Sequence, residues 1–250
     1  MMNNNEIRFN EYLIGADNGP VENVTERHML ILILLDLSGS MYPYTQELQR
    51  ALRSLIEQLK NDAATRGSCE ICLISCNGEK PQVLIPFGPL RNVSLPVIQC
   101  HGRTPLHATI HLGLDQLEAR FEQLKTVKCP QYVPFCFVLS DGAPTDTDNG
   151  AVERIVKKQT AKHAPCLVYP IGVGPYAEEK GKSFLGSLHA GHTVWTGKYQ
   201  QISRFFKFVA ASTKNVLGTK PGENVRLLKP DDGGFDFDKT NVPYDMMIID

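Results

Sequence analysis

The sequence contains no hydrophobic segment long enough to span a membrane. Its longest apolar run, residues 29 to 35, is seven residues long in a chain of 250, whereas a helix needs about 20 apolar residues to cross a bilayer. The first ten residues are polar and contain neither the basic region nor the apolar region of a signal peptide. From these two absences we expect a cytoplasmic protein that has no membrane partner.

The sequence also lacks a strong charge of either sign. It has 26 basic and 27 acidic residues, a formal net charge of -1, and no stretch gathers Lys and Arg into a stripe with aromatic residues between them. Since nucleic-acid binders carry such a basic footprint, we expect no nucleic-acid partner. Cys72, Cys136 and Cys166 lie inside apolar runs, where cysteine usually acts as a small buried hydrophobe. We therefore expect free thiols rather than disulfides.

Short apolar runs alternate with longer segments of helical period. The expected strands are residues 29–36, 70–76, 82–87, 133–140, 166–171 and 192–195. Leucines recur every three or four residues at 48–59, and apolar residues do so at 106–124, which indicates helices with one buried stripe. Strands that alternate with helices predict an α/β fold with a doubly wound, Rossmann-like, mainly parallel sheet of six strands. The expected strand order is 3-2-1-4-5-6, with helices on both faces.

One connection is too short for a parallel crossover. Only five residues, 77 to 81, separate the second and third expected strands, so these two strands should form an antiparallel hairpin at one edge of the sheet. The domain should span residues 28–218, preceded by a leader at 1–27. Residues 219–250 are acidic and interrupted by Gly and Pro, so we expect a flexible tail. The alternative is a docking peptide whose Asp236, Asp238, Asp245 or Asp250 occupies a metal site.

Two acids follow buried strands at positions that a doubly wound sheet brings together. Asp36 ends the first expected strand and is followed by Ser38 and Ser40, and Asp141 ends the fourth. Thr104 precedes the helix that leads into the fourth strand. Open α/β sheets bind ligands at this switch point, outside the carboxyl ends of the strands, so the five side chains should converge there.

Two carboxylates and three hydroxyls form an oxygen-only ligand set. Such a set suits a hard, six-coordinate cation, Mg²⁺ or alternatively Mn²⁺, rather than zinc or copper. Two carboxylates do not over-neutralise a divalent ion, so the ion can still accept an anionic ligand from another protein. The sequence therefore predicts a metal site that binds a carboxylate of a partner.

These residues resemble the metal-ion-dependent adhesion site of the von Willebrand factor A domain. Its DxSxS motif matches Asp36, Ser38 and Ser40, its two later elements match Thr104 and Asp141, and the resemblance covers roughly residues 28 to 217. Residues 139–146 and 171–174 look like the bacterial branch associated with tellurium resistance. That resemblance implies a stress-resistance or phage-defence system with kinase- or phosphatase-like partners.

Several nearby residues have more than one interpretation. We expect the rim of the site to include Met41, Tyr42, His101, Arg103 and Asp146. A cluster such as Asp146 and Asp148 more often caps the next helix. Cys69, Cys72 and Cys76 are expected in the core rather than on zinc, because strand residues three apart face opposite sides.

The leading functional hypothesis is an adaptor without enzymatic activity, which docks an acidic residue of a protein partner through Mg²⁺. The first alternative is a metal-dependent phosphoryl-transfer enzyme, because an aspartate beside a metal at a strand end is where phosphate-accepting aspartates lie. An aspartate nucleophile of that type would have a second acid two residues on, and Ser38 stands there. The second alternative is a structural subunit of an ATPase-driven complex.

Overall fold

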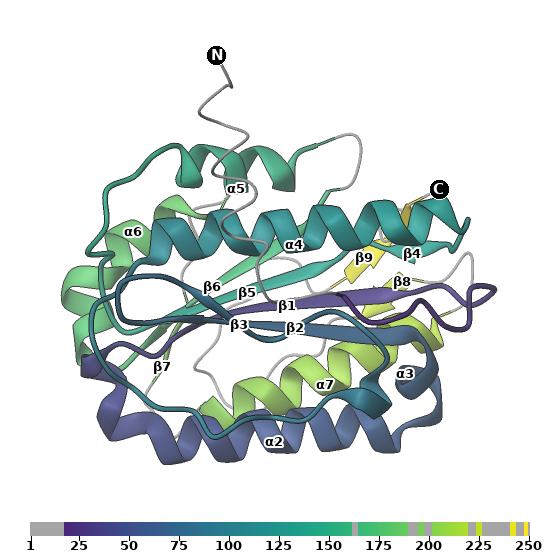
Figure 1. The fold of residues 1–250 in the computed structure, drawn as a ribbon, viewed down its shortest axis with the longest axis horizontal. Helices are drawn as coiled ribbons and strands as arrows, with labels where there is room; N and C mark the ends of the chain where they lie inside the picture. The colour runs from purple at the N-terminus through teal and green to yellow at the C-terminus, as the bar shows by residue number, and fades with distance from the viewer. Residues whose placement is uncertain are drawn as a thin grey trace.

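Six strands form one sheet that separates two layers of helices. The structure is a computed structural model that describes residues 18–161, 165–189, 195–197, 202–219, 224–226, 241–243 and 248–249. The strands of the sheet are β1 (Met29–Asp36), β2 (Cys69–Cys76), β3 (Gln82–Ile85), β5 (Phe135–Ser140), β6 (Leu167–Val173) and β7 (Trp195–Gly197). Their order is β3-β2-β1-β5-β6-β7 (Figure 1), which confirms the predicted order.

Strand β3 is the one antiparallel member of this sheet. It pairs with β2 in an antiparallel register, whereas β1, β2, β5, β6 and β7 pair in parallel with their neighbours. The hairpin predicted from the short connection is therefore confirmed. Strand β3 ends at Ile85 rather than at the expected residue 87, and β6 runs on to Val173. The sixth strand was expected at residues 192–195, of which 192–194 lie outside the described residues.

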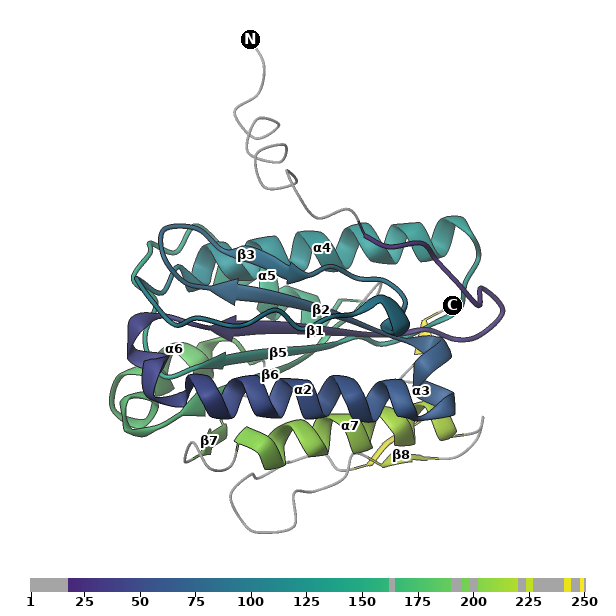
Figure 2. The same cartoon turned by 60° about the horizontal axis from the view of Figure 1, so that its bottom comes forward.

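The helices lie on both faces of the sheet. Helices α4 (Leu106–Thr126), α5 (Ala151–Gln159) and α6 (Lys182–Ser187) cover one face, and α2 (Thr45–Asn61), α3 (Ala63–Ser68) and α7 (Ile202–Gly218) cover the other (Figures 1 and 2). The shorter turns are η1 (Gly39–Tyr44), η2 (Leu90–Asn92) and η3 (Ala177–Gly181). No described helix has the length and apolar character that a membrane span requires.

Strand β1 supplies side chains to both cores. Ile31 and Ile33 pack in the core under α2 and α7, whereas the intervening Leu32 and Leu34 pack in the core under α4. This division follows from the strand period of two, which sends successive side chains to opposite faces. Cys72 and Cys136 are also fully buried in the second core, as their apolar surroundings in the sequence predicted. A strand with two buried faces has room for polar groups only at its ends.

Three short strands are described among residues 219–250, the segment that was expected to be a flexible tail. Strand β8 (Asn224–Arg226) pairs with β9 (Asn241–Pro243), and β10 (Ile248–Ile249) pairs antiparallel with β4 (Gln131–Tyr132). The flexible tail was predicted from the Gly and Pro residues of this segment. Its β-branched residues instead favour strands where another strand edge is available for pairing. The four tail aspartates singled out above lie outside the described residues.

A buried charge cluster joins α4 to the amino end of the sheet. Arg120 is 1% exposed, and its Nε and Nη2 each donate to the Glu70 carboxylate at 2.8 Å. Its guanidinium also donates to the backbone carbonyls of Gly19 and Pro20. His28 Nδ1 lies 3.1 Å from Glu70 Oε1. The cluster therefore attaches the segment before β1 to the core, and nothing in the periodicity of α4 predicted it.

The substitution Arg120→Met is expected to lower the free energy of unfolding by about 3–5 kcal/mol, because it leaves the buried Glu70 carboxylate without its cation. Urea unfolding monitored by circular dichroism measures the loss. The double variant Arg120→Met/Glu70→Gln should recover part of it. Arg50→Gln breaks an exposed ion pair with Glu47 on α2 and is the control, with an expected effect below about 1 kcal/mol. A loss for Arg120→Met as small as the control's would contradict this account.

Candidate metal centre

The candidate site lies where β1 and β5 end side by side. Leu35 pairs with Leu139 in the parallel register of these strands, so the residues that follow both strands leave the sheet at the same edge. The chain turns from β1 toward β2 on one side, and β5 lies on the other. This arrangement is the topological switch point of a doubly wound sheet, and it brings Asp36 and Asp141 to one place as predicted.

Asp36 is fully buried and is held by hydrogen bonds to both oxygens. Its Oδ1 accepts from the backbone N–H of Ser38 at 2.8 Å, and its Oδ2 accepts from the Ser140 hydroxyl at 2.5 Å. The Ser140 hydroxyl in turn accepts from the backbone N–H of Gly142 at 3.1 Å. These contacts fix the direction of the carboxylate before any ligand arrives.

A chain of side-chain contacts runs from the first loop to Asp141. The hydroxyl oxygens of Ser38 and Ser40 are 3.1 Å apart, and Ser40 Oγ donates to Asp141 Oδ1 at 3.0 Å. Ser38 and Asp141 are buried, whereas Ser40 is exposed. The site therefore opens to solvent on the Ser40 side.

Thr104 lies in a loop that is hydrogen-bonded to the loop after β5 and to the loop after β1. Its backbone N–H donates to the Thr145 hydroxyl at 3.0 Å, and its carbonyl accepts from the Thr145 N–H at 2.9 Å. On the other side, the carbonyl of Gly102 accepts from Gly39 N–H at 3.1 Å. Gly102 has φ of +71°, and a Cβ there would lie 2.7 Å from the Cα of Gly78. Only glycine allows this close approach.

Burial shapes the electrostatics of the two acids. It raises the pKa of Asp36 from 3.8 to about 6, although the hydrogen bonds from Ser140 and Ser38 lower it and the charge of Asp141 adds to the rise. Burial also raises the pKa of Asp141. Among the described residues, no ion pair gives either Asp36 or Asp141 a counter-charge, and a divalent cation would supply it.

The donor set fits a hard divalent cation. Carboxylate and hydroxyl oxygens are the protein ligands of Mg²⁺ and similar ions, and the residues that could hold it are Asp36, Ser38, Ser40, Thr104 and Asp141. In the described part of the chain, no group of three or more His, Cys, Asp or Glu could hold a metal ion. A metal ion bound at this site would be coordinated by hydroxyl oxygens as well as by carboxylates.

The structure corrects two of the expected rim residues. Met41 is 0% exposed and packs in the core under α2, because the 3-10 turn η1 directs it inward. The Asp146 carboxylate accepts from the N–H groups of His107 and Ala108 and so caps α4. Asp148 accepts from Gly150 and Ala151 and caps α5, which is the capping role that was expected for this cluster.

Three rim residues remain available at the surface. Tyr42 is 73% exposed, and His101 and Arg103 are also exposed. His101 Nε2 lies 3.1 Å from the Asn77 side-chain amide nitrogen. Sequence reasoning missed Ser140 and Thr145, which support Asp36 and Thr104. Ser140 could have been identified, because it ends a strand expected to lie beside the first.

No protein-family model and no curated protein matches the sequence. Solved structures do match its fold. One is a proximal thread matrix protein 1 from the mussel byssus with a zinc-occupied metal-ion-dependent adhesion site motif. It is 14% identical to this chain with a TM-score of 0.52, and the matched region covers 74% of this chain and 48% of that protein. A von Willebrand factor type A protein from Catenulispora acidiphila is 16% identical with a TM-score of 0.53 and coverages of 76% and 43%.

The pilus adhesin SpaC from Lactobacillus rhamnosus GG is 13% identical to this chain with a TM-score of 0.55. The matched region covers 79% of this chain and 32% of that protein. This chain thus spans less than half the length of these three proteins. At these identities the similarity establishes the fold alone. The chain has a von Willebrand factor A fold.

The metal-free protein is expected to lose stability as pH rises, because of Asp36. Its pKa in the folded state, about 6, lies above the ordinary value of 3.8, so folding favours the protonated form. The stabilisation is full below about pH 4 and is lost as pH rises through about 6. In EDTA, Asp36→Asn should therefore gain roughly 3 kcal/mol relative to the wild type between pH 4 and 7.

Urea unfolding of both proteins across this pH range measures the difference, and Asp148→Asn is the control that should show no such gain. A difference between Asp36→Asn and the wild type that stays constant with pH would show that Asp36 ionises freely in the folded protein.

Proposed function

We propose that this chain is a protein-interaction module whose Asp36, Ser38, Ser40, Thr104 and Asp141 bind Mg²⁺, or Mn²⁺, and that the ion accepts a carboxylate from a partner protein. The observation that carries the proposal is the convergence of two buried, uncompensated carboxylates and a serine pair at the switch point of the sheet. The module comprises residues 28–218, and its site of action is the cytoplasm.

The charge of the ligand set favours binding over catalysis. Two carboxylates balance a divalent cation without reversing its charge, so an anionic group from outside still gains by joining the coordination shell. Ser40 and Tyr42 are both exposed in the segment that follows β1, where a partner can approach. Arg103, also exposed in the Thr104 loop, adds a positive charge that suits an acidic partner.

The partner class in this proposal is a kinase- or phosphatase-like protein of a bacterial stress-resistance system. Its support is the resemblance of residues 139–146 and 171–174 to the branch associated with tellurium resistance. The strand portions of both segments are buried and inaccessible to a partner. In this proposal the loops that surround the ion therefore recognise the partner.

Mg²⁺ is expected to raise the melting temperature of the wild type. A ligand at 100 times its dissociation constant stabilises the folded state by about 2.7 kcal/mol. The shift should vanish in Asp141→Asn and shrink in Ser40→Ala, while Asp148→Asn, which changes only a helix cap, should retain it. Thermal unfolding with and without Mg²⁺ measures these shifts. Equal shifts in Asp141→Asn and the wild type would place the ion elsewhere.

The immobilised protein is expected to retain a partner from cell extract in Mg²⁺ and to release it in EDTA. Ser38→Ala should fail to capture the same partner although its circular dichroism spectrum is unchanged. Retention of the partner under both conditions would favour a structural subunit. The protein should also be incubated with phosphoryl donors and phosphatase substrates. Metal-dependent turnover that is lost in Asp36→Asn would favour the enzyme hypothesis over the adaptor hypothesis.

A further inference from the structure

A groove lies between the amino-terminal half of α2 and the segment that leads from η2 toward Thr104. Gln49 joins its two walls, because its Nε2 donates to the Pro96 carbonyl at 3.1 Å and its Oε1 accepts from the Ile98 N–H at 2.8 Å. The segment can be followed alongside α2 in Figure 1. The groove has a volume of about 270 Å³, and its lining residues include Gln46, Gln49, Arg50, Arg53 and Val97.

Both walls of this groove are continuous with loops of the candidate metal centre. The α2 wall begins at Thr45, five residues after Ser40, and the other wall ends at Ile98, six residues before Thr104. The Thr45 hydroxyl donates to Cys100 Sγ at 3.2 Å, which joins the two walls at the end nearer to these loops. The groove therefore begins beside the metal loops and leads away from them along α2.

The charge of the groove is positive. Gln46, Gln49, Arg50 and Arg53 follow one another at spacings of three, one and three residues in α2, which places their side chains on one face of the helix. The two arginines are the charged members of this face, and none of the described residues that line the groove is an acid. The groove therefore attracts a negatively charged segment.

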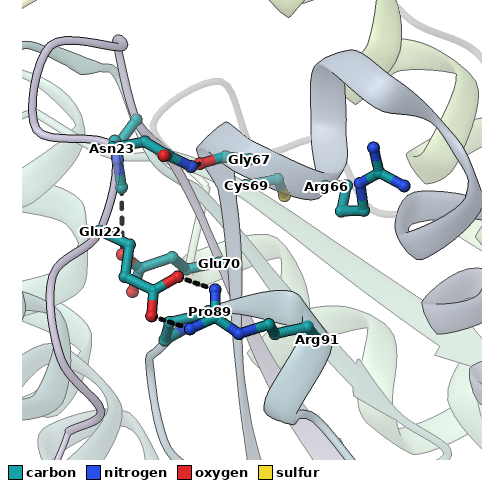
Figure 3. Close-up of a pocket in the computed structure, with 9 residues that line it drawn as sticks. Glu22, Asn23, Arg66, Gly67, Cys69, Glu70, Pro89 and Arg91 are labelled. Carbon is teal, nitrogen blue, oxygen red and sulfur yellow. Dashed lines mark hydrogen bonds and ion pairs between the residues drawn. The ribbon is translucent and has the colours of Figure 1, made fainter.

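The two guanidinium groups are available to a ligand. The Arg50 side chain is 73% exposed, and its one printed ion pair, with Glu47, has a distance of 3.5 Å. In the described part of the chain, the exposed Arg53 has no hydrogen-bond or ion-pair partner. Arg91 differs in this respect, because the Glu22 carboxylate already pairs with its guanidinium (Figure 3).

An apolar side chain lies next to these charges. Val97 is 81% exposed, although the neighbouring Ile98 is 3% exposed and packs in the core under α2. The two hydrogen bonds of Gln49 hold the backbone on either side of Val97. A partner that covers Val97 with an apolar side chain removes both surfaces from water, which favours association.

The length of the groove sets the spacing between the acids of such a partner. Arg53 lies eight residues after Thr45 in α2, which is about 12 Å along the helix axis. The turn η1, which connects Ser40 to this helix, adds at most about 10 Å. An extended chain advances about 3.3 Å per residue, so the second acid should follow the first by about five or six residues.

We propose that this groove binds an extended acidic segment of the partner protein. One carboxylate of the segment joins the metal ion, an apolar side chain covers Val97, and a second carboxylate about five residues further on pairs with Arg50 and Arg53. The inference rests on the proposed metal-dependent function and adds a second contact that selects among acidic partners.

The test titrates the full-length protein, labelled with ¹⁵N, with three synthetic peptides in Mg²⁺ and at low ionic strength, where exposed charges are least screened. The reference peptide is Asp-Gly-Leu-Ser-Gly-Glu with blocked ends. The second peptide has Gln in place of its Glu, and the third has Gly in place of its Leu. Amide chemical shifts give the dissociation constants. The reference peptide should bind about threefold to fivefold more tightly than either of the others.

The double variant Arg50→Gln/Arg53→Gln should bind the reference peptide and its Gln form equally. The control Arg66→Gln/Lys125→Gln removes the same charge from exposed positions on α3 and α4 and should keep the preference of the wild type. Val97→Ser should abolish the preference for the peptide with Leu over the peptide with Gly. Binding of all three peptides should weaken in EDTA and in Asp141→Asn.

The outcomes separate the groove from the metal-dependent function. A preference for the reference peptide that persists in Arg50→Gln/Arg53→Gln would overturn the groove and leave the metal-dependent function intact. Equal binding of all peptides in the wild type, or no binding while Mg²⁺ still raises the melting temperature, would have the same meaning. Peptide binding that is unchanged in EDTA and in Asp141→Asn would contradict the metal-dependent function itself and, with it, a two-point contact.

Discussion

The continuous burial of β1 is the constraint on which the rest of the structure depends. Every residue from Met29 to Asp36 is at most 1% exposed, because helices cover both faces of the sheet. Polar chemistry is thereby excluded from the middle of the strand and confined to its ends. Asp36 ends the strand and His28 directly precedes it, so the candidate metal centre and the buried cluster of His28, Glu70 and Arg120 lie at opposite ends of the same buried strand.

Two buried acids near this strand are compensated in different ways. Glu70 receives two charge-assisted hydrogen bonds from Arg120, and its charge is balanced within the chain. Asp36 receives hydrogen bonds from Ser38 and Ser140, but the charge that acts on its pKa is that of another carboxylate, Asp141, which raises it. A buried charge without a partner is costly. The first acid therefore stabilises the fold, whereas the second gains from binding a cation.

The sequence predicted the parts of the molecule that depend on local pattern. Apolar runs and the short hairpin connection were sufficient to predict the strand order. The position of acids at strand ends was sufficient to predict that Asp36 and Asp141 lie at the same edge of the sheet. Met41 was misplaced because the direction of a side chain in a 3-10 turn depends on what packs beneath it. Arg120 and the pairing of β10 with β4 were missed because both depend on contacts between residues far apart in the chain, for which a single sequence carries no periodic signal.

The position of β10 bears on the source of the carboxylate that would complete the metal shell. Strand β4, its partner, precedes β5 and lies at the amino end of the sheet, near the end of β1 where His28 lies. Asp36 and Asp141 lie at the carboxyl end, some 20–25 Å away along the strands. While β10 is paired in this way, the residues of that strand do not reach the metal centre of their own chain. The strand β10 itself therefore cannot supply the carboxylate that would complete the proposed metal shell.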